Sequence, residues 1–183
     1  MFKQKKIVFD LETKLGFDEI NSREDIPQMG VSVAVVYNYA SRDFSTYFEE
    51  EIPQLIEALF KADLVIGFNI KRFDYRVLSR YTEVDFTQLP TLDILEDIEK
   101  VLGFRIKLDN LVKTTLGQGK SADGKMAVKW YRAGKIDKVA RYCQEDVRLT
   151  KELYEYGCKW GKIWHTDKNG TRRSIFVKWM VAV

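Results

Sequence analysis

Three short segments with strand-like composition follow one another near the start of the chain. The first, residues 7–11 (IVFDL), is a short apolar run bounded by charged residues. The second, residues 30–38 (GVSVAVVYN), is rich in β-branched residues, and the third, residues 43–48 (DFSTYF), alternates like a strand. Because sequential strands usually pair with one another, these segments predict an antiparallel meander.

A helix and further strand signals come next. Residues 52–62 (IPQLIEALFKA) have helical spacing, and residues 64–68 (LVIGF) form a short apolar run. Together with the first segments they indicate a strand, a crossover helix and a strand. Residues 73–82 (FDYRVLSRYT) again have helical periodicity, and residues 90–95 (PTLDIL) begin either a strand or a short helix.

The second half of the chain is dominated by helical patterns. Residues 108–117 (LDNLVKTTLG) predict a helix that stops at a glycine, and residues 117–125 (GQGKSADGK) predict a loop. A short helix over residues 126–134 and a long one over residues 135–157 follow. The tail predicts a hairpin turned at residues 168–170, because Asn-Gly favours tight hairpin turns.

Length and composition indicate an ordinary globular chain. The 183 residues are 45% hydrophobic and 31% charged, with three prolines, so we expect one domain over residues 1–183, with residues 161–183 as a hairpin appendage. The net charge of +3 is too balanced to indicate a general polyanion binder. No apolar run approaches ~20 residues and no signal peptide is evident, so we expect a cytoplasmic protein that makes no membrane contact.

Both cysteines fall in one predicted helix. Cys143 and Cys158 are fifteen positions apart, about 22 Å at the rise of an α-helix. A disulfide between them would require the helix to break, so we expect reduced thiols.

Two acidic residues fall on one face of the first predicted strand. Asp10 and Glu12 are two positions apart, so their side chains leave the same face while Leu11 points to the opposite one. Two unpaired carboxylates on an otherwise apolar strand repel each other, and a cation held between them is an economical explanation. Alternatively, Asp10 ends an exposed strand and Glu12 is solvated in the following loop.

Other polar residues have two interpretations each. Tyr142 and Asp146 are one helical turn apart and share a face, which taken alone is typical of ordinary packing. Asp74 lies at or near a helix start, where it would act either as a cap or as part of a site. Asn69 would likewise act either as a turn residue or as part of a site.

Taken together, three motifs resemble those of the DEDD superfamily of exonucleases, tyrosine subtype: FDLET at residues 9–13, N-x-x-x-F-D at residues 69–74, and Y-x-x-x-D at residues 142–146. The sequences of these motifs are most similar to those of the 3′-to-5′ exonuclease domain of family B DNA polymerases and of small standalone YprB-like proteins. The likeness runs from about residue 6 to about residue 160. It implies an α/β, ribonuclease H-like fold, in which helices flank a five-stranded mixed sheet whose first three strands form the meander, here followed by the C-terminal β-hairpin.

The resemblance also implies roles for five side chains. Asp10, Glu12, Asp74 and Asp146 would hold two divalent cations, Mg²⁺ or Mn²⁺, about 3.5–4 Å apart. Asp10 would bridge the ions, Glu12 and Asp146 would complete the one that activates water, and Asp74 would help hold the one at the leaving group. Tyr142, with an ordinary pKa near ~10, would orient the water rather than act as a base.

Substrate contacts are expected around the second motif. Asn69 and Phe73 would contact the substrate, with Phe73 stacking on a base, unless Phe73 is simply part of the core. Phosphate contacts would come from Lys71, Arg72 and Arg76 near the second motif, and from Lys120, Lys125 and Lys129 in and after the glycine-rich loop. A solvated helix face is the alternative for the basic residues.

The only histidine lies away from these motifs. The histidine subtype of the superfamily would need His at position 141, which is Arg141 here. His165 falls in the predicted hairpin, and we expect it to be a partly exposed strand residue.

The implied function is a two-metal-ion 3′-to-5′ exonuclease that acts on single-stranded nucleic acid, DNA in preference to RNA, and releases nucleoside 5′-monophosphates. Alternatives are a catalytically silent nucleic-acid-binding module, and a structure-specific endonuclease or ribonuclease on the same fold. Any helicase or polymerase activity would have to come from a separate partner protein.

Overall fold

The computed structural model describes residues 5–119 and 124–179, so Lys120 lies outside the described residues. A five-stranded sheet with the order β3-β2-β1-β4-β5 forms its centre. β1, β2 and β3 pair antiparallel, whereas β1, β4 and β5 are parallel, so the predicted mixed sheet with its meander is confirmed. The strands are β1 (Lys6–Thr13), β2 (Val31–Asn38), β3 (Asp43–Tyr47), β4 (Leu64–Gly67) and β5 (Thr91–Asp93).

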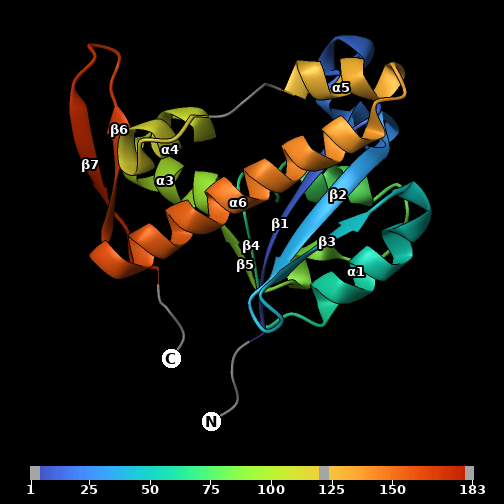
Figure 1. Cartoon of the computed structure of the whole chain (residues 1–183), viewed down its shortest axis with the longest axis horizontal. Coiled ribbons are helices and arrows are strands. Elements are labelled where there is room, and N and C mark those ends of the chain that lie inside the picture. The colour runs from blue at the N-terminus through green and yellow to red at the C-terminus, as the bar shows by residue number, and fades with distance from the viewer. Residues whose placement is uncertain (1–4, 120–123, 180–183) are drawn as a thin grey trace.

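Helices flank this sheet (Figure 1). They are α1 (Ile52–Phe60), α2 (Asp74–Leu78), α3 (Ile94–Leu102), α4 (Leu108–Leu116), α5 (Gly124–Arg132) and α6 (Ile136–Trp160). The described residues also form short 3-10 helices, η1 (Phe17–Glu19), η2 (Arg23–Met29), η3 (Glu49–Glu51) and η4 (Phe86–Gln88). None of the helices within the described ranges is long and apolar enough to cross a membrane.

Several predicted boundaries need correction. The segment after Pro90 contains both a strand and a helix, because Asp93 ends β5 and caps α3 through the backbone N–H groups of Leu95 and Glu96. The glycine-rich loop ends earlier than expected, since Gly124 already belongs to α5. The stop of α4 is confirmed: Gly117 has φ +70°, a conformation that favours glycine.

The sheet is covered on both faces. On one face, Val8 and Val33 pack into a core with Val147 of α6, which crosses the sheet (Figure 1). On the other face, Phe9 belongs to a second core with Leu55 of α1. Because side chains alternate along a strand, the β1 face that carries Val8 also carries its even-numbered acids toward α6.

The C-terminal hairpin forms a separate two-stranded sheet from β6 (Lys162–Thr166) and β7 (Arg172–Phe176). It packs against α4, where the amide of Asn110 donates to the Thr166 carbonyl at 2.8 Å and accepts from the Thr166 N–H at 2.9 Å. The hairpin therefore covers α4 rather than extending the main sheet. His165 is buried, and its ring lies 6.3 Å from that of Phe104, measured between centroids, so the expectation of partial exposure is wrong. Cys143 and Cys158 both lie on α6 as free thiols.

Candidate active site

The centre of the sheet carries two of the predicted acids. Asp10 is partly buried and Glu12 is buried on β1, while Leu11 packs into the opposite core. Both acids lie opposite residues of β2, Asp10 opposite Val35 and Glu12 opposite Val33, which fixes the direction of both carboxylates, whereas the pairing of β1 with β4 ends at Val8. Its register with β2 shifts between Glu12 and Thr13, and such irregularities re-aim side chains next to functional sites.

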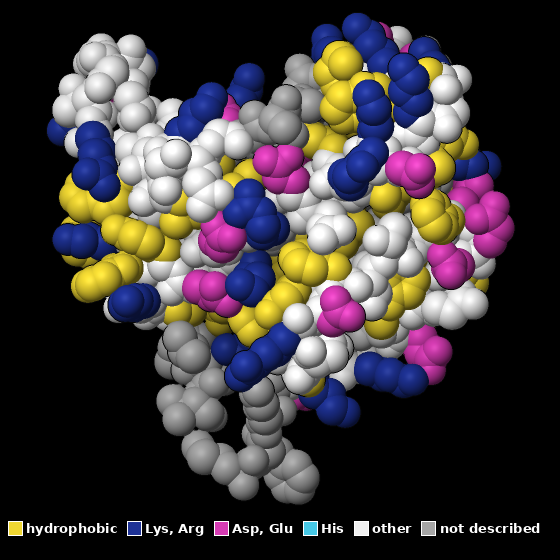
Figure 2. Space-filling model, in the orientation of Figure 1, with side chains coloured by type: hydrophobic (Ala, Val, Ile, Leu, Met, Phe, Trp, Pro, Cys, Tyr) yellow, Lys and Arg dark blue, Asp and Glu magenta, His cyan; other side chains and the backbone are white. Residues whose placement is uncertain are grey.

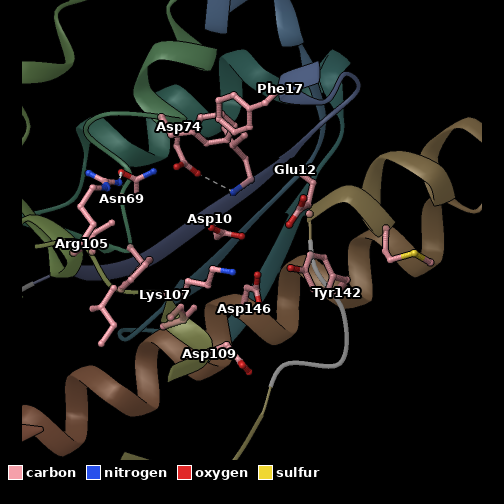
Figure 3. A pocket seen from close by; sticks show the side chains of 18 of the residues that line it. Asp10, Glu12, Phe17, Asn69, Asp74, Arg105, Lys107, Asp109, Tyr142 and Asp146 are labelled. Atoms are coloured by element: carbon pink, nitrogen blue, oxygen red, sulfur yellow. Dashed lines mark hydrogen bonds between the residues drawn. The ribbon is translucent and has the colours of Figure 1, made fainter. Parts of the chain in front are cut away.

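Helix α6 adds a third acid to this face. Tyr142 and Asp146 are both buried one turn apart, because α6 packs lengthwise over β1 and β2. Carboxylate oxygens of Asp10, Glu12 and Asp146 all lie within 4.8 Å of one another. Figure 3 shows these three side chains directed toward a common space, with the Tyr142 ring beside them. Residues far apart in sequence therefore form one acidic cluster.

The donor set of this cluster fits a hard divalent cation. Three carboxylates supply oxygen ligands of the type that Mg²⁺ and Mn²⁺ prefer, and two of the three are buried. Like charges held this closely repel one another in a site of low polarity, and a bound cation removes that repulsion. The cluster can therefore bind metal, and its members are Asp10, Glu12 and Asp146.

Asp74 lies beside the cluster rather than in it. Its Oδ1 accepts a hydrogen bond from the backbone N–H of Leu11 at 3.1 Å, as the dashed line in Figure 3 shows. It is the first residue of α2, it is 2% exposed, and burial raises its pKa above the ordinary value. Asp74 nevertheless lines the same cavity as Asp10 and Asp146.

The Tyr142 phenol is held in its neutral form. Its pKa is raised above the ordinary value, first by burial and then by the nearby carboxylate of Asp146, with smaller effects of Glu12 and Asp10. A neutral phenol donates a hydrogen bond but does not accept a proton at neutral pH. This environment fits an orienting group rather than a base.

The loop after β4 is held in a strained conformation by one carboxylate. Asn69 has φ +70°, which non-glycine residues seldom adopt, although asparagine tolerates it better than most. Asp93 accepts from the backbone N–H of Asn69 at 2.8 Å and from that of Lys71 at 3.0 Å. The Asn69 side chain accepts from Arg105 at 2.7 Å. Asp93 therefore positions the segment that leads to Asp74.

The other predicted binding residues separate into two groups. Phe73 lines the cavity, and its ring lies 5.3 Å from that of Phe17, measured between centroids. Lys71 pairs with Glu96 at 2.8 Å and Arg72 with Glu99 at 2.8 Å, so both cations are partly neutralised by α3. Arg76 lies in an adjoining groove rather than in the cavity itself.

The cavity has a volume of about 1020 Å³, and the lining residues that were not predicted from the sequence include Phe17, Arg105, Lys107 and Met126. Figure 3 shows Lys107 extending toward the acidic cluster. Arg105 and Lys107 belong to the basic stretch FRIK between α3 and α4, which is a detectable signal in the sequence. Phe17 has no such signal.

Two lysines predicted after the glycine-rich loop do not line this cavity. Lys125 and Lys129 are exposed on α5, whereas Met126 of the same helix lines the cavity. Figure 2 shows Lys and Arg side chains gathered over α5. These cations therefore border the site from outside.

Residues 7–158 match the ribonuclease H superfamily, and the chain belongs to that superfamily. The family B DNA polymerase of the hyperthermophilic archaeon Pyrobaculum calidifontis has a similar fold, with a TM-score of 0.65 and 17% sequence identity. The similarity covers 84% of this chain but only 24% of the polymerase. No curated protein sequence matches significantly. Membership of this superfamily supports a nuclease that acts on nucleic acid with divalent metal.

Proposed function

We propose that the protein is a metal-dependent 3′-to-5′ exonuclease that acts on single-stranded nucleic acid. The observation that carries this proposal is the convergence of Asp10, Glu12 and Asp146, whose carboxylate oxygens lie within 4.8 Å of one another. Asp74 lines the same cavity as these acids. Bound there, Mg²⁺ or Mn²⁺ would activate a water and stabilise the leaving 3′ oxygen.

The residues around the acids have separable tasks. The Tyr142 phenol donates a hydrogen bond that orients the attacking water, because its raised pKa keeps it protonated. The water oxygen attacks phosphorus, the bond from phosphorus to the 3′ oxygen breaks, and a nucleoside 5′-monophosphate leaves. The shortened strand keeps a 3′-hydroxyl.

Aromatic side chains at the cavity wall suit a single-stranded end. Phe17 is 61% exposed and packs against Phe73, so the pair offers ring faces to an unpaired base. We propose DNA in preference to RNA, since the motifs resemble those of the exonuclease domain of DNA polymerases and the fold is similar to that of one such polymerase.

A comparison of linear and circular strands tests this proposal. Purified protein is incubated with 5′-labelled single-stranded DNA or RNA, in Mg²⁺, in Mn²⁺ or in chelator, and circular single strands are included in parallel. We expect progressive shortening of the linear strands only in the presence of metal, intact circles, and faster cleavage of DNA.

Two results would contradict the proposal. Cleavage of the circle would indicate an endonuclease on the same fold, since a circle has no 3′ end. Binding of single strands without any metal-dependent cleavage would indicate a catalytically silent module.

A further inference from the structure

A second groove, with a volume of about 580 Å³, adjoins the active-site cavity. Five cationic side chains line it, and no carboxylate does so among the described residues. We call it the arginine groove, and its cations are Arg23, Lys71, Arg72, Arg76 and Arg105. This concentration of positive charge is not apparent from the balanced net charge of the chain.

The cations of the arginine groove are not equally neutralised. Lys71 and Arg72 pair with Glu96 and Glu99, two acids of α3. No ion pair within 4.0 Å is formed by Arg23 or by Arg76 in residues 5–119 and 124–179. Arg76 has only a minor electrostatic effect on the exposed Glu24. The positive potential of the groove therefore depends mainly on Arg23 and Arg76.

The groove is continuous with the cavity. Phe17, Asn69, Phe73 and Arg105 line both spaces, so a strand that enters one can pass into the other. Arg105 is anchored at this junction by its 2.7 Å hydrogen bond to Asn69 and by Glu99, 3.5 Å from its guanidinium. The aromatic pair marks the boundary between the two spaces.

A competing path leads from the cavity toward the hairpin. It is lined by three cations, Arg105, Lys107 and Lys113, but also by the carboxylate of Asp109, which pairs with Lys113 at 2.8 Å. A polyanion gains less from this mixed surface than from a groove whose charged lining residues are all cations. The arginine groove is therefore the better match to a phosphate backbone.

We infer that the arginine groove binds the phosphate backbone of the strand on the 5′ side of the bond that is cleaved. This inference rests on the proposed function, because it takes the 3′ end to lie among the carboxylates. Arg23 and Arg76 bind phosphates of the upstream nucleotides, and Arg105 guides the strand from the cavity into the groove. Affinity consequently increases with strand length and depends on salt.

Equilibrium binding separates this inference from the proposed function. Dissociation constants are measured in chelator, where no cleavage is required, for a dinucleotide and for a longer labelled single strand. The Arg23→Ala/Arg76→Ala variant is compared with the wild type. We expect it to weaken binding of the longer strand about tenfold more than binding of the dinucleotide. The slope of the logarithm of the association constant against the logarithm of the salt concentration should also become less steep by about 1.4. Each contact with a single-strand phosphate contributes about 0.7 to this slope, and the variant loses two such contacts.

Two matched double variants act as controls. Lys61→Ala/Arg173→Ala removes the same charge from exposed ion pairs outside all these spaces, and it should leave both affinities unchanged. Lys125→Ala/Lys129→Ala tests the exposed cations of α5. A length-dependent loss in the α5 variant instead of the groove variant would overturn the inference.

Three further results would also overturn it. An equal loss for the dinucleotide and the longer strand would place the arginines at the 3′ end. An unchanged salt slope would show that they do not bind phosphates. Wild-type affinity of the groove variant for the longer strand would exclude the groove as a binding site. If strands bind as expected but are never cleaved, the proposed function fails, while the assignment of the arginine groove to phosphate binding stands.

Discussion

The buried carboxylate of Asp74 accepts a hydrogen bond from the backbone N–H of Leu11, the residue between the two acids of β1. The first turn of α2 is thereby joined directly to the strand that presents Asp10 and Glu12. Because this hydrogen bond is buried, water cannot replace it, and breaking it would leave a donor and an acceptor unsatisfied at a cost in free energy. The relative positions of the acids are fixed before any metal or substrate binds.

This link predicts opposite effects of two substitutions at Asp74. Asp74→Asn keeps an oxygen for the Leu11 N–H and replaces a carboxyl group whose ionisation is disfavoured by burial, so stability in chelator should equal or exceed that of the wild type. Asp74→Ala leaves the buried N–H unsatisfied and should lower the free energy of unfolding by about 1–3 kcal/mol. Urea denaturation in chelator measures both. Greater destabilisation by asparagine than by alanine would contradict this role.

Tyr142→Phe should slow cleavage and spare the metal. Loss of one orienting hydrogen bond corresponds to about tenfold in rate. The carboxylates of Asp10, Glu12 and Asp146 remain, so the affinity for Mn²⁺ should be nearly unchanged. Single-turnover cleavage and Mn²⁺ titration by thermal shift check the two parts. Loss of metal binding would mean that Tyr142 supports the metal site itself.

Asp93→Ala should destabilise the fold more than an ordinary cap substitution does. Asp93 accepts backbone hydrogen bonds both from the start of α3 and from the loop that contains Asn69. Its removal should lower the free energy of unfolding by roughly 2–4 kcal/mol. Weaker substrate binding should accompany this loss, because the loop also carries Phe73.

Asp85→Ala is the matched control for this prediction. Asp85 also caps a helix, but it is exposed and its carboxylate accepts hydrogen bonds from the backbone and the hydroxyl of Thr87, within the helix that it caps. Chemical denaturation of both variants gives the comparison. Similar losses from the two substitutions would show that Asp93 acts only as a helix cap.

Gly157→Ala should destabilise the protein although alanine normally favours a helix. A Cβ at this position would lie 2.3 Å from the ring of Trp179, which packs on α6 while its indole N–H donates to Asp97 at 2.7 Å. We expect a loss of about 1–3 kcal/mol in the free energy of unfolding. Adding Trp179→Leu should make the alanine substitution less harmful, as a double-mutant cycle would measure. Stabilisation by Gly157→Ala would contradict this packing.

The sequence predicted the parts of the fold that depend on local pattern. The meander followed from three successive strand-like segments, and α6, which spans Ile136–Trp160, from the helical pattern over residues 135–157. The acids at positions 10 and 12 were assigned to one face because side chains alternate along a strand. Their convergence with Asp146 was expected from a family resemblance, since no local pattern relates residues so far apart.

Features that depend on tertiary contacts were not predictable in this way. Arg105 reaches the site because its side chain bonds to Asn69, a contact across 36 positions. Phe17 lies between β1 and β2, in a segment whose sequence has no periodic pattern. Only its contact with Phe73 in the structure indicates a role at the site. The short length of α2 and the burial of His165 likewise depend on neighbouring elements rather than on local sequence.

The most direct measurement of the central claim is the rate at which mononucleotides are released from a 3′-end-labelled single strand in Mn²⁺, for the wild type and for Asp146→Asn. This substitution keeps the shape of the side chain and removes its charge from the acidic cluster. We predict release of nucleoside 5′-monophosphate by the wild type, and a rate on the order of a thousandfold lower for the variant, equivalent to about 4 kcal/mol. Release at the wild-type rate by Asp146→Asn would contradict a catalytic centre built on Asp10, Glu12 and Asp146.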